Sequence, residues 1–286
     1  MKRASTLSAV LAVFVLAAPS LGVLALSPPA GAAVIGSYNL DQCANGGSGS
    51  TATSCVEGWE NGNLNESKAH YAEGDSVPYR LKFSGLTVGQ YKMKIEWDVL
   101  KGTGHALDYL TTWNRTVTGA DPCVGVTGCA SALASTYPIP KDNVSPAPAN
   151  QVSGVFTMFG ATINGVSGYT RNGEATSITI TFTTVTGGLT NPVLAWGGHI
   201  ATRADWGPGS SAGAISGSPY HTRGIEMTDP RGESGGGNQD RALSSSAVIA
   251  PASITVVKVA APKDPQAFPF TTTGLAPSTF SLADDG

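Results

Sequence analysis

Residues 90–99, QYKMKIEWDV, constrain the fold more than any other segment, because apolar and polar side chains alternate strictly along them. One face of this segment, in an extended chain, would carry Tyr91, Met93, Ile95, Trp97 and Val99. A period of two residues is typical of a β-strand with one buried and one solvent face. No segment after residue 32 keeps apolar residues at helical spacing between caps. The sequence therefore predicts a β protein.

Residues 77–83 and 178–182 also alternate, and residues 192–196, 245–250 and 252–259 are predicted as further strands, all separated by Gly, Pro and Asn clusters. Many short strands of this kind predict an all-β fold, an antiparallel β-sandwich or jelly-roll-like domain. Pro78 has no N–H for a ladder, so we expect it at a strand start or an edge. Residues 138–150 and 206–241 are rich in Pro or Gly and are expected to be surface loops. Long loops are uncommon in compact domains unless they bind something or are mobile.

The first 32 residues are predicted to be a secretory signal peptide. Lys2 and Arg3 precede a long apolar run, and Ala30, Gly31 and Ala32 fit a cleavage site. An uncleaved membrane anchor is the alternative, because the run approaches spanning length. Removing 32 of the 286 residues leaves 254, and Lys+Arg falls from 17 to 15 against 20 Asp+Glu, a net charge of −5. This balance predicts no nucleic-acid partner, and we expect membrane contact only during export.

The chain has four cysteines, all in the first half of the mature sequence. An exported protein meets an oxidising compartment, where disulfides are the default. Of the three possible pairings we favour Cys43–Cys55 and Cys123–Cys129, because each closes a short Gly-rich loop. A four-cysteine zinc site is the alternative, but it would lack the usual C-x-x-C knuckle.

The sequence EWDVLK, residues 96–101, resembles the E-x-D-x-x-E signature of jelly-roll glycoside hydrolases. That family implies a carboxylate nucleophile at the first position and a carboxylic acid at the last. Lys101 occupies the last position here and cannot act as that acid. We therefore expect Glu96 and Asp98 to be ordinary solvent-face charges. No G-x-S-x-G elbow or nucleotide-binding glycine motif is present, and we assign no catalytic residue.

The histidines and the loop acids each suggest a candidate binding site. A site could form in space from His105, Asp108, His199 and His221, but none of the histidine spacings brings two ligands together on one element. Histidines more often form a hydrogen bond that fixes a loop, and we favour that role. A weak calcium hypothesis rests on four loop acids, whose spacing matches no calcium-binding loop. These are Asp205, Asp229, Glu233 and Asp240. We predict no bound metal or other cofactor.

Several aromatic residues lie beside Gly, Asn or Thr instead of inside apolar runs. The candidates for ligand contact are Trp59, Trp113, Trp206 and Tyr220. Exposed tryptophan and tyrosine form platforms for sugars or proteins, because they offer a large area at a low entropy cost. Covering the open end of a sandwich core is the alternative role, and we favour it for the tryptophans, Trp196 included.

The carboxy-terminal residues 252–286 resemble the opening of prealbumin-like (collagen-binding-protein B-type) repeats in secreted and wall-attached bacterial proteins. In that comparison Ile254, Val256 and Lys258 match an I-x-V-x-K first strand, and Phe280 and Leu282 match a later F-x-L-x-D-x-G strand. The resemblance implies the first strands of an incomplete Ig-like module. It also implies a possible isopeptide bond at Lys258, with an asparagine beyond residue 286. A solvent-facing lysine is the alternative.

These observations predict three segments: a signal peptide (1–32), a β-sandwich domain (33–250) and an incomplete prealbumin-like module (251–286). The upstream region also resembles leading domains of bacterial multi-module surface proteins, on the segments HALDYLTTWNR, AWGGHIATRADWG, GSPYHTR and GGNQDRALS. We expect a non-enzymatic, secreted or surface-displayed structural or adhesion module, the amino-terminal part of a longer protein. Its partner would be a protein or a glycan at the cell exterior. The alternative is a carbohydrate-binding or, less favoured, carbohydrate-degrading sandwich.

Overall fold

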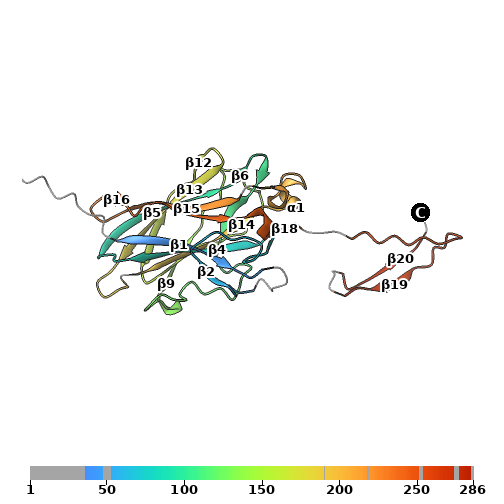
Figure 1. Ribbon diagram of the computed structural model, residues 1–286, viewed down its shortest axis with the longest axis horizontal. Coiled ribbons are helices and arrows are strands. Elements are labelled where there is room, and N and C mark those ends of the chain that lie inside the picture. Colours follow the sequence, from blue (N-terminus) through green and yellow to red (C-terminus); the bar gives the residue numbers. More distant parts are fainter. Residues whose placement is uncertain are drawn as a thin grey trace, which may run out of the picture. The chain divides into compact units, whose positions relative to one another are not determined.

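The computed structural model describes residues 36–47, 53–189, 191–217, 219–250, 254–273 and 277–284. The predicted signal peptide lies outside these ranges. The chain is 44% strand and 6% helix, and its large sheets are antiparallel (Figure 1). The predicted all-β class and the β-sandwich are confirmed. Among the described residues, no helix is long and apolar enough to cross a membrane.

Two seven-stranded antiparallel sheets form the sandwich. The first sheet has the order β2-β1-β4-β14-β10-β9, with β8 also paired to β14. Its strands are β1 (Ser37–Ala44), β2 (Gly58–Glu60), β4 (Ser76–Ser84), β8 (Leu107–Thr111), β9 (Ala134–Pro138), β10 (Val155–Phe159) and β14 (Val193–Ile200). The second sheet has the order β11-β13-β5-β15-β16, with β12 on β13 and β17 on β15. Its strands are β5 (Gly89–Asp98), β11 (Thr162–Val166), β12 (Thr170–Asn172), β13 (Ala175–Thr184), β15 (Tyr220–Thr228), β16 (Ser234–Gly235) and β17 (Gln239–Leu243).

Short elements close the ends of the sandwich. The strands β3 (Tyr71–Ala72) and β18 (Val248–Ile249) pair in parallel, and β6 (Leu100–Lys101) pairs with β7 (Gly104–His105). The helix α1 (Arg203–Trp206) is a single turn, and three 3-10 turns are present in the described chain. These are η1 (Ser131–Leu133), η2 (Ala212–Ala214) and η3 (Ser245–Ala247).

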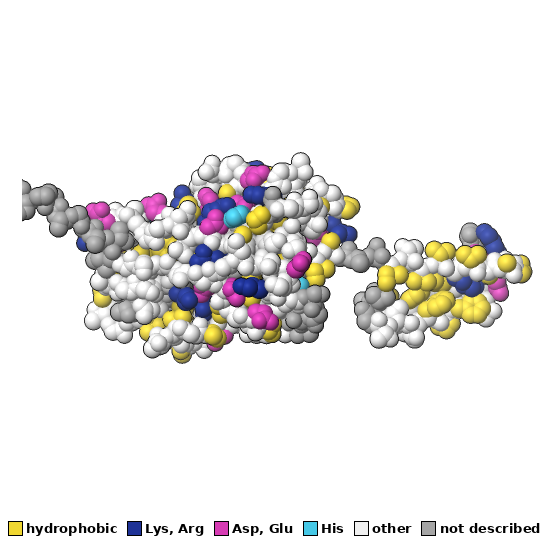
Figure 2. All heavy atoms as spheres, viewed as in Figure 1, with side chains coloured by type: hydrophobic (Ala, Val, Ile, Leu, Met, Phe, Trp, Pro, Cys, Tyr) yellow, Lys and Arg dark blue, Asp and Glu magenta, His cyan; other side chains and the backbone are white. Residues whose placement is uncertain are grey.

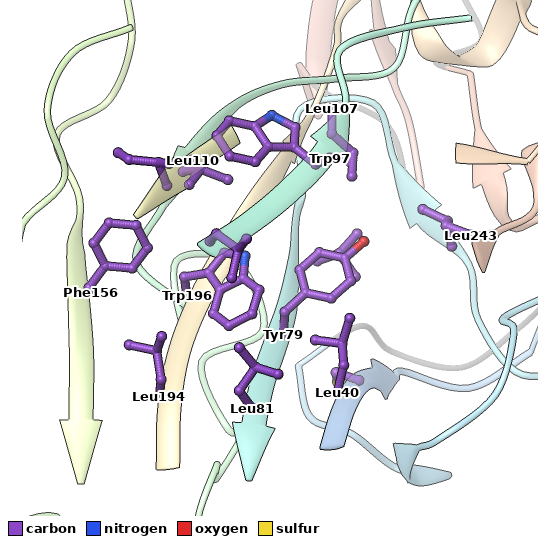
Figure 3. Packing of buried hydrophobic residues seen from close by; sticks show 14 of the residues in the cluster. Leu40, Tyr79, Leu81, Trp97, Leu107, Leu110, Phe156, Leu194, Trp196 and Leu243 are labelled. Atoms are coloured by element: carbon purple, nitrogen blue, oxygen red, sulfur yellow. The ribbon is translucent and has the colours of Figure 1, made fainter. Parts of the chain in front are cut away.

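The main core lies between the two sheets, and the alternation along each strand explains it. In the first sheet Leu40, Leu81 and Leu194 stand side by side in register and point inward (Figure 3). The predicted inward face of β5 is buried along its whole length, from Tyr91 to Val99. The rings of Phe83 and Phe182, one from each sheet, have centroids 5.0 Å apart. Burial of this apolar surface is the main favourable term in folding.

A second, smaller cluster lies on the outer face of the first sheet. Phe159, Val193 and Ala195 are buried there beneath the segment that contains Cys123 and Cys129. Both predicted disulfides are present, Cys43–Cys55 and Cys123–Cys129, each with Cα atoms 5.2 Å apart. A loop fastened by a disulfide thus covers one outer face of the sandwich.

Proline and loop predictions have mixed outcomes. Pro78 lies near the start of β4, as expected, but not at an edge, because β4 is a central strand and Pro78 lies opposite Gly197 of β14; the β1 ladder begins at the next residue, Tyr79. Residues 139–154 form no regular element, which agrees with the predicted loop. The predicted loop at 206–241 is wrong beyond residue 219, because β15, β16 and β17 occupy most of it. The predicted strand at 245–250 shrinks to η3 and the two-residue β18.

The carboxy-terminal residues form a hairpin of β19 (Phe268–Thr271) and β20 (Thr279–Leu282). The expected strand at 252–259 is wrong for its described part, because residues 254–259 have no ladder partner in the described chain. An extended segment becomes a strand only through pairing. Apolar side chains stay exposed here, among them Ile254 at 68%, Val257 at 73% and Phe268 at 42%, and Figure 2 shows this concentration of yellow.

Candidate functional site

Tyr220 is not a surface residue, so its prediction as a ligand contact is wrong. Its side chain is fully buried, and its hydroxyl donates to the carbonyl of Ala212 at 2.7 Å. Burial raises the pKa of Tyr220, and the nearby Glu73 carboxylate adds to that effect. The phenol therefore stays neutral and serves as a fixed hydrogen-bond donor.

The three tryptophans are half-buried and pack against the main core, as we favoured from the sequence. Trp59 has its ring beneath the Arg80 guanidinium, 4.7 Å from the ring centroid, and its Nε1 donates to Asp121 O at 2.8 Å. A sugar ring would have to displace this cation to stack on that face. Trp196 is fully buried between the sheets.

Arg80 joins the outer face of the first sheet to the disulfide loop above it. Its guanidinium lies 3.0 Å from Asp41 Oδ2, and both side chains are nearly inaccessible, 5% and 1% exposed. Its Nη1 also donates to the carbonyls of Pro122 at 2.8 Å and Val124 at 2.6 Å. The charge pair is thus surrounded by satisfied polar groups, which is the condition for burying it.

A polar and aromatic cluster forms at one end of the sandwich and contains three of the four residues proposed as a site. Asp108 accepts from His199 Nδ1 at 2.7 Å and, on its other oxygen, from Trp206 Nε1 at 2.9 Å. The His105 ring stacks on Trp206 with centroids 3.5 Å apart, and Tyr109 stacks on His199 at 4.2 Å. Asp108 and His199 are buried, so this cluster ties β8, β14 and α1 together.

Burial lowers the pKa of His105, and the nearby Asp108 carboxylate only partly opposes that effect. The imidazole is therefore uncharged at neutral pH. Its Nδ1 is buried and has no hydrogen-bond partner in the described chain. An uncharged ring that is stacked and partly unbonded is held mainly by packing, whereas the role favoured from the sequence was a hydrogen bond that fixes a loop.

His221 lies in a separate network on the second sheet. Its Nδ1 donates to Asp240 at 2.7 Å, and its backbone N–H donates to Asp98 at 3.0 Å. Asp98 also accepts from Arg223 Nη1 at 2.8 Å, and the same guanidinium lies 3.3 Å from Glu96. The expectation that Asp98 is a solvent-face charge is wrong, because these partners cover it and leave it 3% exposed.

The four acids of the calcium hypothesis do not converge on one site, although Asp229 and Glu233 share a turn in which Glu233 N donates to Asp229 Oδ1 at 3.0 Å. Asp205 accepts from Thr202 at 2.7 Å, Asp229 pairs with Arg231 at 2.7 Å, and Asp240 belongs to the His221 network. No group of three or more His, Cys, Asp or Glu side chains in the described ranges could hold a metal ion. These four carboxylates therefore do not build a calcium site.

Sequence reasoning missed Glu73, which fixes the glycine-rich loop between β14 and β15. Its carboxylate accepts from Ser211 Oγ at 2.7 Å, Gly213 N at 2.9 Å and Arg203 N at 3.0 Å. The Glu73 side chain is completely buried. Two further bonds hold the loop, from His105 N to Ser210 O at 2.8 Å and from Tyr220 to Ala212. These hydrogen bonds therefore fix the conformation of the loop against the rest of the fold.

A cavity of about 410 Å³, broadly open to solvent, lies beside this loop, where the β6–β7 hairpin and the turn between β12 and β13 approach it. Its lining includes Lys101, Thr103, Glu174, Gly209, Ile215 and Ser216. Small-molecule sites span roughly 300–1,000 Å³, so the volume suits a small ligand. The lining is predominantly polar.

Lys258 is engaged within its own segment. Its Nζ donates to Gln266 O at 3.2 Å and lies 4.4 Å from the centroid of the Phe268 ring. The isopeptide bond stays a prediction.

Comparisons of the chain with protein-family models, with curated proteins and with solved structures found no match. The resemblance to prealbumin-like repeats therefore also stays a prediction, and the function has to be argued from the geometry alone.

Proposed function

We propose that this chain is a non-enzymatic adhesion or structural-display module of a secreted or surface-displayed protein. The observation that carries the proposal is the preformed loop end of the sandwich, where buried Glu73 holds residues 203–213 in place. Binding surfaces of sandwich domains are commonly loops positioned by a rigid scaffold. A fixed loop also loses little entropy on binding, so more of the contact energy remains as affinity.

Two disulfides support the proposed location, since disulfides form and persist outside the reducing cytoplasm. The low charge content and the glycine-rich loops suit a surface exposed to solvent. A glycan-binding module is the second candidate, and the polar cavity beside the loop favours it.

The proposal is tested with beads coated with the purified mature protein. Retention of the beads is measured under flow on surfaces carrying extracellular-matrix proteins or cell-wall glycans. We expect retention on at least one surface and weaker retention for Glu73→Gln, because that substitution loosens the loop. The same surfaces and soluble glycans are then analysed for released products. Absence of retention, or product release that stops in His199→Gln, would overturn a non-enzymatic adhesion role.

A further inference from the structure

The cavity beside the loop is built from three segments that are distant in the sequence. The β6–β7 hairpin contributes Lys101, the β12–β13 turn contributes Glu174, and the glycine-rich loop contributes Gly209 and Ile215. A Cβ at Gly104 would collide with Ile215, so the hairpin and the loop are closely packed. Together with the bonds to Glu73, this packing gives the cavity a defined shape before any ligand enters.

The two charged side chains that line the cavity, Lys101 and Glu174, form only a long ion pair with each other. Lys101 Nζ lies 3.5 Å from Asp98 Oδ2 and 3.7 Å from Glu174 Oε2. Good N–H···O bonds have donor–acceptor distances of about 2.7–3.2 Å. Asp98 already accepts closer bonds from Arg223 and from the backbone of His221. The Lys101 ammonium and one Glu174 oxygen therefore keep hydrogen-bonding capacity toward the cavity.

We propose that this cavity binds an uncharged, hydroxyl-rich ligand, a neutral carbohydrate. A hydroxyl both donates and accepts, so neighbouring hydroxyls accept from Lys101 and donate to Glu174. The hydroxyls of Thr103 and Ser216 add further partners, and Ile215 offers an apolar surface to the C–H groups of a sugar ring.

Other ligand classes fit less well. The lining carries one positive side chain, Lys101, and one negative side chain, Glu174, so its net charge favours neither an anion nor a cation. An apolar ligand would remove both charges from water without replacing their hydrogen bonds, which is unfavourable. The site differs from the tryptophan platforms considered earlier, because none of those rings lines the cavity. This inference rests on the proposed recognition role and names the ligand class of that role.

A steric variant tests the site without changing its charges. Gly209 lines the cavity, its φ is not in the left-handed region, and a Cβ there meets no atom within 4 Å. Gly209→Trp therefore fits the backbone and places a large side chain at the wall of the cavity. Gly168 has the same freedom in an exposed turn away from the cavity, so Gly168→Trp is the matched control.

Binding is measured by ligand-observed NMR with a panel of neutral monosaccharides and disaccharides, at up to 10 mM. We expect at least one sugar to bind the wild type and Gly168→Trp, with a tenfold or greater loss in Gly209→Trp. Lys101→Met should weaken binding similarly, whereas Lys92→Met, which changes an exposed lysine on the outer face of β5, should not. Thermal unfolding of every variant establishes that it is folded.

No sugar binding by the wild type, or binding unchanged in Gly209→Trp and Lys101→Met, would overturn the inference. Bead retention on protein-coated surfaces without sugar binding would overturn this inference and leave the adhesion role standing. Sugar binding accompanied by hydrolysis would support the site and overturn the non-enzymatic role.

Discussion

The Glu73 carboxylate accepts hydrogen bonds from the glycine-rich loop. Glu73→Gln removes the buried charge of this carboxylate and nearly preserves the shape of the side chain. The glutamine carbonyl can still accept from Ser211 Oγ and Gly213 N, but its amide group then faces the Arg203 N–H, and two donors oppose each other. A hydrogen bond to a charged group contributes about 1.5–3 kcal/mol. The Arg203 guanidinium at 3.4 Å adds little, because its side chain is 38% exposed. We therefore expect local destabilisation of about 2 kcal/mol.

Amide hydrogen exchange measures this effect directly. About 2 kcal/mol corresponds to roughly 30-fold faster exchange where the loop opens locally. We expect that acceleration at Arg203 and Gly213, and a larger one in Glu73→Ala, which leaves three donors without an acceptor. Glu57→Gln, an exposed turn residue, serves as the control and should change stability by less than about 0.5 kcal/mol. Unchanged protection at Arg203 and Gly213 in Glu73→Gln would refute the anchoring role.

Three further predictions concern the buried charges, the stacked histidine and the outer loop. Asp41→Asn should destabilise the fold by about 3–5 kcal/mol in urea, since it leaves the Arg80 guanidinium buried without its carboxylate; a loss below about 1 kcal/mol would contradict this. Because burial lowers the pKa of His105, the unfolded chain binds this proton at higher pH, and stability falls as pH drops below about 6.5. His105→Phe keeps the stacking and should show a smaller loss of melting temperature between pH 7.5 and 5, and an unchanged slope would count against the argument. The double variant Cys123→Ser with Cys129→Ser should lose about 2 kcal/mol in chemical unfolding; full wild-type stability would show that the crosslink is redundant.

Strands were predictable where their two faces differ in chemistry. β5 and β13 carry large apolar residues inward and charges or threonines outward, so their alternation is unambiguous. β15 was missed because its inward positions include the small Thr222 and Gly224, and a register shift between Gly224 and Glu226 breaks the period. A side chain at Gly224 would collide with Tyr38 and Met93, so close packing between the sheets requires glycine there. The same glycine interrupts the apolar alternation by which the strand could have been predicted.

The candidate site was less predictable, because its contacts join distant segments. Alternation placed Asp98 on the outer face correctly, but it carried no information about Arg223, which covers that residue. Glu73 lies in a polar turn without a distinctive motif. The groups that donate to its carboxylate are 130 to 140 residues away in the sequence. Short-range cysteine pairing was predictable for the opposite reason, because spacing alone favours the closure of small loops.

The disulfide loop above Arg80 makes the two broad sides of the sandwich unequal. One side is covered by the segment that contains the Cys123–Cys129 disulfide, and carbonyl groups of this segment accept hydrogen bonds from the buried Arg80 guanidinium. The opposite side presents the outer faces of the central strands β5 and β13, with Lys92 and alternate threonines turned toward solvent. The two broad sides of the sandwich therefore differ in chemistry, so a partner that docks on one side would meet a different surface from a partner that docks on the other.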